Sequence, residues 1–123
     1  MLVSNKKNSN KGNYAGLSTN LLIGELNSGS KEISIQTTDV QPKEMQPIHS
    51  HEEEQCYYII SGSGMMLIDE QRKEVKEGDA IFIPSNSKHG IINIAEQVLT
   101  YLTANKAFGK KREAEIWPDK PAL

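Results

Sequence analysis

Short apolar stretches alternate with polar residues along most of the chain, at spacings typical of β-strands. No segment between residues 14 and 104 shows the period of an amphipathic helix. Apolar, aromatic and β-branched runs predict strands at residues 21–23, 33–38, 56–60, 65–68, 80–83, 91–94 and 98–103. Strands this short, with turn signals roughly every 8–12 residues, are typical of an antiparallel sandwich or barrel. We therefore expect an all-β fold.

Glycine and small polar residues mark the turns between these strands. The sequence Ser-Gly-Ser-Gly predicts a hairpin turn at residues 61–64, the polar run at 69–73 predicts the next, and Gly-Asp predicts a third at 78–79. Pro84 follows the apolar run at 80–83, and we expect it to end that strand because proline cannot donate to a sheet ladder.

The two ends of the chain differ from its middle. Residues 1–13 are polar and rich in asparagine and lysine, so we expect a flexible N-terminal arm. Residues 14–123 are expected to form a single domain whose core spans about residues 20–104. Apolar residues lie among charges at 106–117, which predicts a short helix that ends before Pro118.

Composition narrows the classes of partner and compartment. The chain has 123 residues, a formal charge of −2 and a single cysteine, Cys56. A nearly balanced charge gives no global field toward nucleic acid or an anionic membrane, so we expect neither partner. One cysteine excludes an intrachain disulfide. With no apolar run of signal-peptide or membrane-span length, we expect a cytoplasmic protein.

The three histidines are the clearest candidates for chemistry. His49 and His51 form a His-x-His pair, whose side chains share one face if the segment is a strand. Continuing that face along the chain reaches Glu53 and Gln55. Neutral imidazole is a common ligand of Zn, Fe, Ni and Cu, so two convergent rings supply half of a metal site. Such pairs also occur on protein surfaces without a metal, so the pair alone does not establish a metal site.

The residues around the histidines resemble the two signature motifs of the cupin family. The second motif is matched by Gly78, Pro84, His89 and Asn93, with Asn86 at its inner glycine position. The first motif is matched by His49, His51 and Gly62. Lys43 stands where the family has its opening glycine, and Gln55 stands where it has a glutamate. Asn tolerates left-handed backbone, which suits it to the glycine position that it occupies.

This resemblance implies a fold, a metal site and an assembly. The fold would be an antiparallel jelly-roll β-barrel, also called a double-stranded β-helix, and the chain would form a homodimer. Inside the barrel one divalent transition metal ion (Fe, Ni, Mn, Co, Cu or Zn) would be held by His49, His51, Gln55 and His89. Without the carboxylate, the site would be one charge more positive around the ion. Glu53, Glu54 or a water molecule remain alternatives to Gln55.

The cupin fold hosts many activities, so the resemblance alone does not name a function. One hypothesis is a metal-dependent enzyme of the isomerase, lyase or dioxygenase type. It would act on a small oxygen-rich substrate such as a sugar, a sugar acid or a related carbonyl compound, with Glu53, Tyr57 and Tyr101 as candidate catalytic residues. The other is a non-catalytic module that binds or senses a small molecule or a metal. We expect the enzyme.

Overall fold

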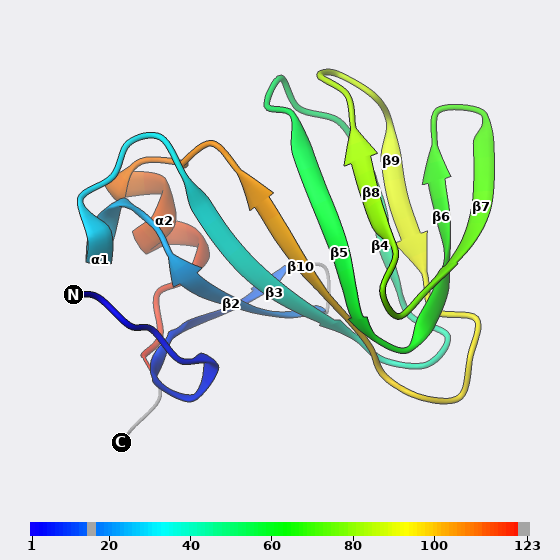
Figure 1. Cartoon of the computed structure of the whole chain (residues 1–123), viewed down its shortest axis with the longest axis horizontal. Coiled ribbons are helices and arrows are strands. Elements are labelled where there is room, and N and C mark those ends of the chain that lie inside the picture. Colours follow the sequence, from blue (N-terminus) through cyan, green and yellow to red (C-terminus); the bar gives the residue numbers. More distant parts are fainter. Residues whose placement is uncertain (15–16, 121–123) are drawn as a thin grey trace.

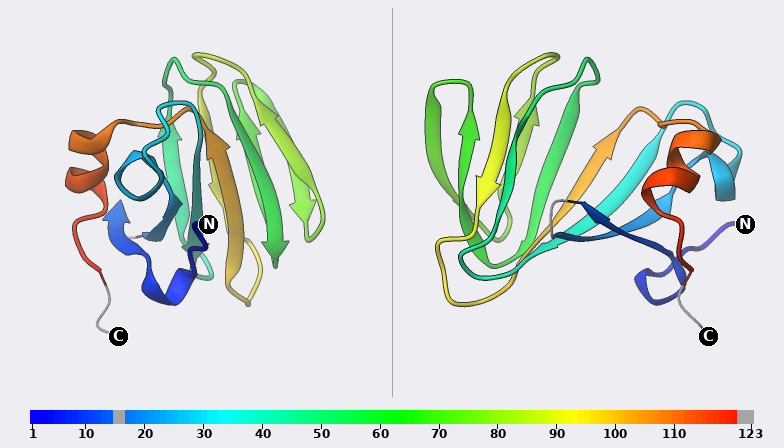
Figure 2. Two further views of the ribbon diagram at one scale, coloured as in Figure 1. Left: turned by 60° about the vertical axis from the view of Figure 1, so that its left-hand side comes forward. Right: turned by 180° about the vertical axis from the view of Figure 1, so that it is seen from behind.

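Two antiparallel β-sheets face each other in the computed structural model, which describes residues 1–14 and 17–120 (Figures 1 and 2). The six-stranded sheet has the order β1 (Asn10–Tyr14), β2 (Leu17–Ile23), β3 (Ser34–Val40), β10 (Leu99–Asn105), β5 (Gln55–Ser61) and β8 (Ala80–Ile83). The four-stranded sheet has the order β4 (Met45–His49), β9 (His89–Ile92), β6 (Ser63–Ile68) and β7 (Gln71–Lys76). The elements outside the sheets are the 3-10 helix η1 (Lys6–Asn8), α1 (Glu25–Ser28) and α2 (Lys110–Ile116).

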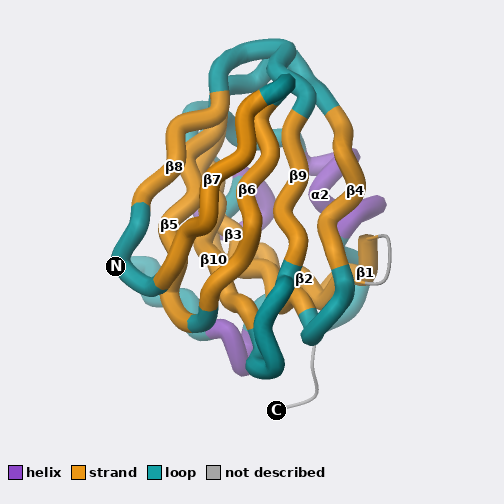
Figure 3. Tube along the Cα trace, turned by 90° about the vertical axis from the view of Figure 1, so that its right-hand side faces the viewer, coloured by secondary structure: helices purple, strands orange, loops and turns teal. Residues whose placement is uncertain are grey.

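The core lies between the two sheets, and Figure 3 shows the smaller sheet in front of the larger one. Buried side chains alternate with exposed ones in β5 and with partly buried ones in β10, as expected where one face of a strand covers a core. The buried members include Tyr57, Ile59 and Tyr101 from the large sheet, and Met66 and Ile91 from the small one. This is the all-β jelly-roll fold that the strand pattern and the family resemblance predicted.

The six-stranded sheet extends beyond its partner, and α2 with the residue after it covers the extra width (Figure 2). The indole N–H of Trp117 donates to Thr19 Oγ1 at 3.0 Å, and the Trp117 carbonyl accepts from the Asn10 amide at 3.0 Å. Gly12 on β1 lies so close to the Ile116 carbonyl that a Cβ atom has no space. The helix predicted at 106–117 is confirmed, with its bounds at Lys110–Ile116.

The arm expected at residues 1–13 is partly built into the sheet. Residues 10–14 form β1, which pairs along its whole length with β2. Before it, the Lys6 ammonium binds the Asp39 carboxylate at 2.9 Å. The pattern of apolar residues did not predict this strand because its sequence, Asn-Lys-Gly-Asn, is polar. An edge strand that is held by backbone hydrogen bonds needs no apolar run.

One of the expected turns is wrong, and another is shorter than expected. Residues 61–64 do not form a hairpin, because β5 and β6 belong to different sheets and the chain passes between the sheets at Gly62, whose φ is 84°. The turn expected at 69–73 is confined to residues 69–70, and Gln71 already begins β7. Its charged sequence QRKEVK is typical of an edge strand, where charges block pairing with other chains.

Candidate metal centre

An extra residue in β4 aims His49 into the space between the sheets. Gln46 pairs with Ile91 and His49 pairs with His89, so β4 advances three residues while β9 advances two. This β-bulge places Gln46 and His49 on the same side of the strand, whereas regular alternation would place them on opposite sides. Pro47 lies in the bulge of an edge strand, where its missing N–H costs no ladder bond.

Gly90 lets β9 approach this bulge closely. A Cβ atom at Gly90 would lie 2.7 Å from the Gln46 carbonyl oxygen and 3.3 Å from the Ile48 backbone nitrogen. Any larger residue would therefore separate β9 from β4. Because these strands carry His89 and His49, the glycine sets the separation of two of the three imidazoles.

His51 lies outside any strand, which corrects the continuous face expected from His49 to Gln55. β4 ends at His49 and β5 begins at Gln55 in the other sheet, so residues 50–54 cross from one sheet to the other. The His51 ring is fixed within this crossing by the carbonyl of Glu53, which accepts from Nδ1 at 2.8 Å. The Glu53 carboxylate is partly exposed and lies 3.8 Å from the same nitrogen.

The loop between β8 and β9 delivers His89. Pro84 directly follows β8, and Asn86 has a φ of 64°, as its place in the motif predicted. The Asn86 N–H donates to the His51 carbonyl at 2.8 Å, which ties this loop to the crossing that carries His51. The Ser87 hydroxyl donates to the Pro84 carbonyl at 2.8 Å. This bond fixes Ser87, whose own carbonyl accepts from Nδ1 of His89.

The three imidazoles converge, and each is oriented in the same way. Their candidate ligand atoms all lie within 4.8 Å of one another. Nδ1 of His49, His51 and His89 lies 2.9, 2.8 and 2.9 Å from the carbonyl oxygens of Pro47, Glu53 and Ser87, respectively. A carbonyl can only accept, so the ring proton is on Nδ1 and the lone pair is on Nε2. Metal-binding histidines are commonly oriented in this way, by a carbonyl that accepts from the ring nitrogen not bound to the metal.

His89 shows most directly that a cation fits here. Its side chain is fully buried, and Nε2 has no hydrogen-bond partner among the described residues. Burial lowers the pKa of His89, and the neighbouring His49 and His51 lower it further, although the bond to Ser87 opposes this. The ring is therefore neutral at physiological pH. A buried acceptor without a partner is costly, and a metal ion at Nε2 supplies the missing interaction.

Gln55 faces His51 across the same space. Its Oε1 atom lies 3.0 Å from His51 Nε2, and the side chain is buried. With the His51 proton on Nδ1, both of these atoms are acceptors. Either the amide is rotated so that its NH₂ group donates to Nε2, or a cation lies between the two. In the second case Gln55 would be a fourth ligand beside the three histidines.

Tyr57 and Tyr101 lie beneath this site as a stacked pair, with ring centroids 4.4 Å apart. Their hydroxyls both donate to Gln46 Oε1, at 2.9 and 2.7 Å. Burial raises the pKa of both phenols above the ordinary value for tyrosine. Neutral, fully engaged phenols are poor proton acceptors, so the geometry disfavours the role of base and instead makes both tyrosines supports for Gln46 and its bulge.

Sequence reasoning missed Gln46 and the role of the carbonyls. Regular strand alternation would turn Gln46 away from His49, and only the bulge brings the two to one side. The backbone carbonyls of Pro47, Glu53 and Ser87 leave no signal in residue type. The single local hint was Pro47 two residues before the histidine, which marks an edge or a bulge.

This is a small antiparallel β-barrel that opens on a cluster of three inward-facing histidines. The family model for the cupin domain matches residues 36–105, and the chain belongs to the cupin family. An uncharacterized protein of Methanocaldococcus jannaschii is 43% identical over 70 residues, which are 56% of this chain and 56% of that protein. The chain thus spans little more than half of this relative.

Three solved structures are similar in fold at low identity. A predicted oxalate decarboxylase from Thermotoga maritima has a TM-score of 0.77 at 19% identity, covering 87% of this chain and all of that one. The polyketide cyclase RemF from Streptomyces resistomycificus has a TM-score of 0.77 at 23% identity, covering 86% and 79%. An RmlC-like cupin from Shewanella frigidimarina has a TM-score of 0.75 at 16% identity, covering 91% and 96%.

Proposed function

We propose that the chain is a metal-dependent cupin enzyme that holds one divalent transition metal ion through His49, His51, His89 and Gln55. The observation that carries this proposal is the shared orientation of the three rings, each with Nδ1 on a backbone carbonyl and Nε2 toward the others. These nitrogen and oxygen donors suit Fe, Ni, Mn, Co, Cu or Zn. Such an ion supplies Lewis acidity toward a carbonyl, enediol or carboxylate oxygen.

The substrate class follows from the charge of the donors. All four proposed ligands are neutral, so the ion's charge is not reduced by a carboxylate and the site favours an anionic or strongly polar oxygen donor. We propose a sugar acid, sugar or related carbonyl compound, and a reaction of the isomerase, lyase or dioxygenase type. The similar enzymes are at most 23% identical to the chain, so they support the fold and not the reaction.

Glu53 is the candidate for moving a proton. Its carboxylate is partly exposed and lies 3.8 Å from His51 Nδ1. Since its backbone carbonyl holds His51, replacing only the side chain leaves that hydrogen bond in place. The variant Glu53→Gln therefore separates proton transfer from metal retention, and we expect turnover to fall while metal content stays unchanged.

The experiment that tests the enzyme is a turnover assay on metal-loaded protein with a panel of sugar acids and hydroxycarbonyl compounds. We expect loss of at least one substrate, and no loss with the His89→Ala variant under the same conditions. Stabilisation by a panel compound without any turnover would contradict the enzyme and favour a binding module.

The expected location and assembly stay predictions. No helix within residues 1–14 and 17–120 is long and apolar enough to cross a membrane. Cys56 is an exposed free thiol, which is compatible with a reducing cytoplasm.

A further inference from the structure

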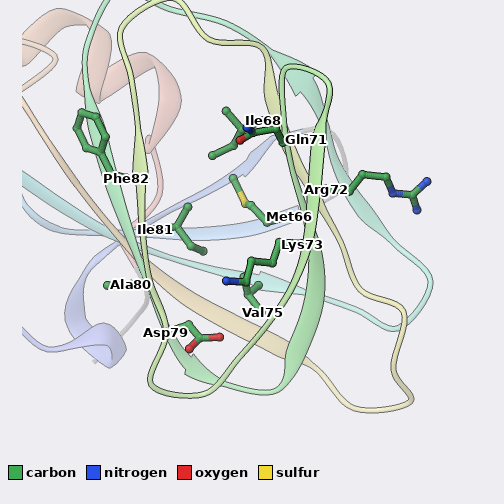
Figure 4. Close-up of a pocket in the computed structure, with 10 residues that line it drawn as sticks. All are labelled: Met66, Ile68, Gln71, Arg72, Lys73, Val75, Asp79, Ala80, Ile81 and Phe82. Atoms are coloured by element: carbon green, nitrogen blue, oxygen red, sulfur yellow. The ribbon is translucent and has the colours of Figure 1, made fainter.

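A second cavity opens where the two sheets separate, between the edge strands β7 and β8 (Figure 4). Its volume is about 340 Å³, within the size range of small-molecule pockets. Buried Met66 and Val75 and partly buried Ile68 and Ile81 form its apolar wall. These residues lie next to the metal centre, because Ile68 of β6 pairs with His89 of the adjacent strand β9. None of them is one of the proposed metal ligands.

Lys73 places a positive charge over this apolar wall. In the β6–β7 register Lys73 pairs with Met66, and Val75, two residues along β7, is buried. Strand alternation therefore turns the solvent-exposed Lys73 toward the cavity, whereas Arg72, which also lines it, extends its guanidinium away from the other lining residues (Figure 4). A lysine on the inner side of a sheet is uncommon, and here it faces a space rather than a packed core.

The Lys73 ammonium has no ion-pair partner in the part of the chain that the structure describes, where the salt bridges join Lys6 to Asp39 and His51 to Glu53. Asp79, the one acid in the cavity wall, accepts a hydrogen bond from the Lys76 N–H at 2.8 Å, so the β7–β8 turn holds its carboxylate. The cavity thus offers an apolar surface with the Lys73 ammonium over it, while Arg72 and the Asp79 carboxylate complete its charged lining.

We propose that this cavity binds a small organic monoanion with an apolar body, such as a carboxylate on a short hydrocarbon or aryl chain. The anionic head meets the Lys73 ammonium, and the body contacts Met66, Ile68 and Ile81. This site goes beyond the proposed metal-dependent function, because none of its contacts requires a metal ion. Ligand binding in this cavity and metal binding at the histidines can therefore be tested independently.

The test compares three probes with one body and different heads: 4-phenylbutyrate, 4-phenylbutan-1-ol and 4-phenylbutylamine. The whole chain is used after chelator treatment, so that a carboxylate cannot bind an ion at the histidines. Methyl NMR of Met66, Ile68 and Ile81 reports where each probe binds. We expect saturable shifts of these methyl groups, with the carboxylate binding about five-fold more tightly than the alcohol and the amine binding most weakly.

Two substitutions separate a binding role of Lys73 from a role in protecting the edge strand. Lys73→Met should bring the carboxylate to the affinity of the alcohol, and Lys73→Glu should favour the amine. The matched control Lys76→Met removes another exposed cation of β7 that does not line the cavity, and it should leave all three affinities unchanged. Equal binding of the three probes would overturn the proposal, as would a Lys73→Met variant that still prefers the carboxylate. The role of Lys73 would then be to prevent the edge strand from pairing with other chains.

Discussion

At the scale of single residues, the candidate site depends on how each ring is held as much as on the rings themselves. Each imidazole is fixed by a backbone carbonyl from a neighbouring loop or bulge. Residue types and their spacing predicted the convergence of His49, His51 and His89. They could not predict the carbonyls, because every residue carries one and only the fold decides which of them faces a ring.

Gln55 provides the sharpest residue-scale prediction. If its oxygen binds the ion, Gln55→Glu replaces a neutral donor with an anionic one, and metal affinity should rise about ten-fold. Isothermal titration of the metal-free protein measures this change. Glu54→Gln changes an exposed carboxyl on the adjacent residue and is the matched control, with affinity expected to stay the same. An unchanged affinity in Gln55→Glu would show that Gln55 is not a ligand.

The buried tyrosines predict a dependence on alkaline pH. Burial raises the pKa of Tyr57 and Tyr101 in the folded chain, so the fold keeps both protons at a pH where the unfolded chain loses them. Their stabilising contribution is therefore complete below the ordinary tyrosine pKa of about 10 and is lost as the pH rises above it. An alkaline titration followed by phenolate absorbance tests this. Tyr101→Phe should show the same change in absorbance near pH 10 as the unaltered chain, because Tyr101 does not ionise at that pH in the folded protein. A loss of one phenol's amplitude there would contradict the burial argument.

At the scale of elements, the chain's patterns predicted strands with apolar faces and missed those without them. The strands with buried residues at alternate positions, β5 and β10, lie where the apolar, aromatic and β-branched runs predicted strands. The polar β1 and charged β7 lie at sheet edges, so their pairing depends on backbone bonds that composition does not reveal. Gly62 was correctly recognised as a bend, but local sequence cannot tell a hairpin from a passage between sheets.

The contact between α1 and α2 gives an element-scale prediction. Glu113 of α2 is fully buried, and its carboxylate accepts from the N–H groups of Glu25 and Leu26 at 2.8 and 3.1 Å. It thereby caps the N-terminus of α1 from another element. Glu113→Ala should lower the free energy of unfolding by about 1–3 kcal/mol in urea denaturation, because two partly buried donors lose a charged acceptor and the fully buried carboxylate is removed. Glu115→Ala on the exposed side of α2 should change it by less than about 0.5 kcal/mol.

At the scale of the whole molecule, the outer face of β5, β8 and β10 stands out because it carries no charge. Its outward positions are Cys56, Tyr58, Ile60, Ala80, Phe82, Thr100, Leu102 and Ala104. Tyr58, Ile60 and Phe82 are 48%, 41% and 56% exposed. Two copies can bring this face together without placing like charges opposite each other, so we propose it as the interface of the expected homodimer.

Light scattering coupled to gel filtration tests this interface. The unaltered chain should elute as a dimer, and Tyr58→Lys should elute as a monomer because it would bury a charge at the centre of the face. Ile33→Lys alters an exposed apolar residue outside the face and should stay dimeric. A monomer before any substitution, or a dimer that survives Tyr58→Lys, would contradict this assignment.

The most direct test of the central claim is elemental analysis of untagged protein purified without chelators or metal columns. The account predicts about one equivalent of a transition metal per chain. It also predicts that His49→Ala and His89→Ala each abolish this content while circular dichroism still shows the β-fold. Protein without metal that also takes up none of the added Fe, Ni, Mn, Co, Cu or Zn ions would contradict the proposed metal centre.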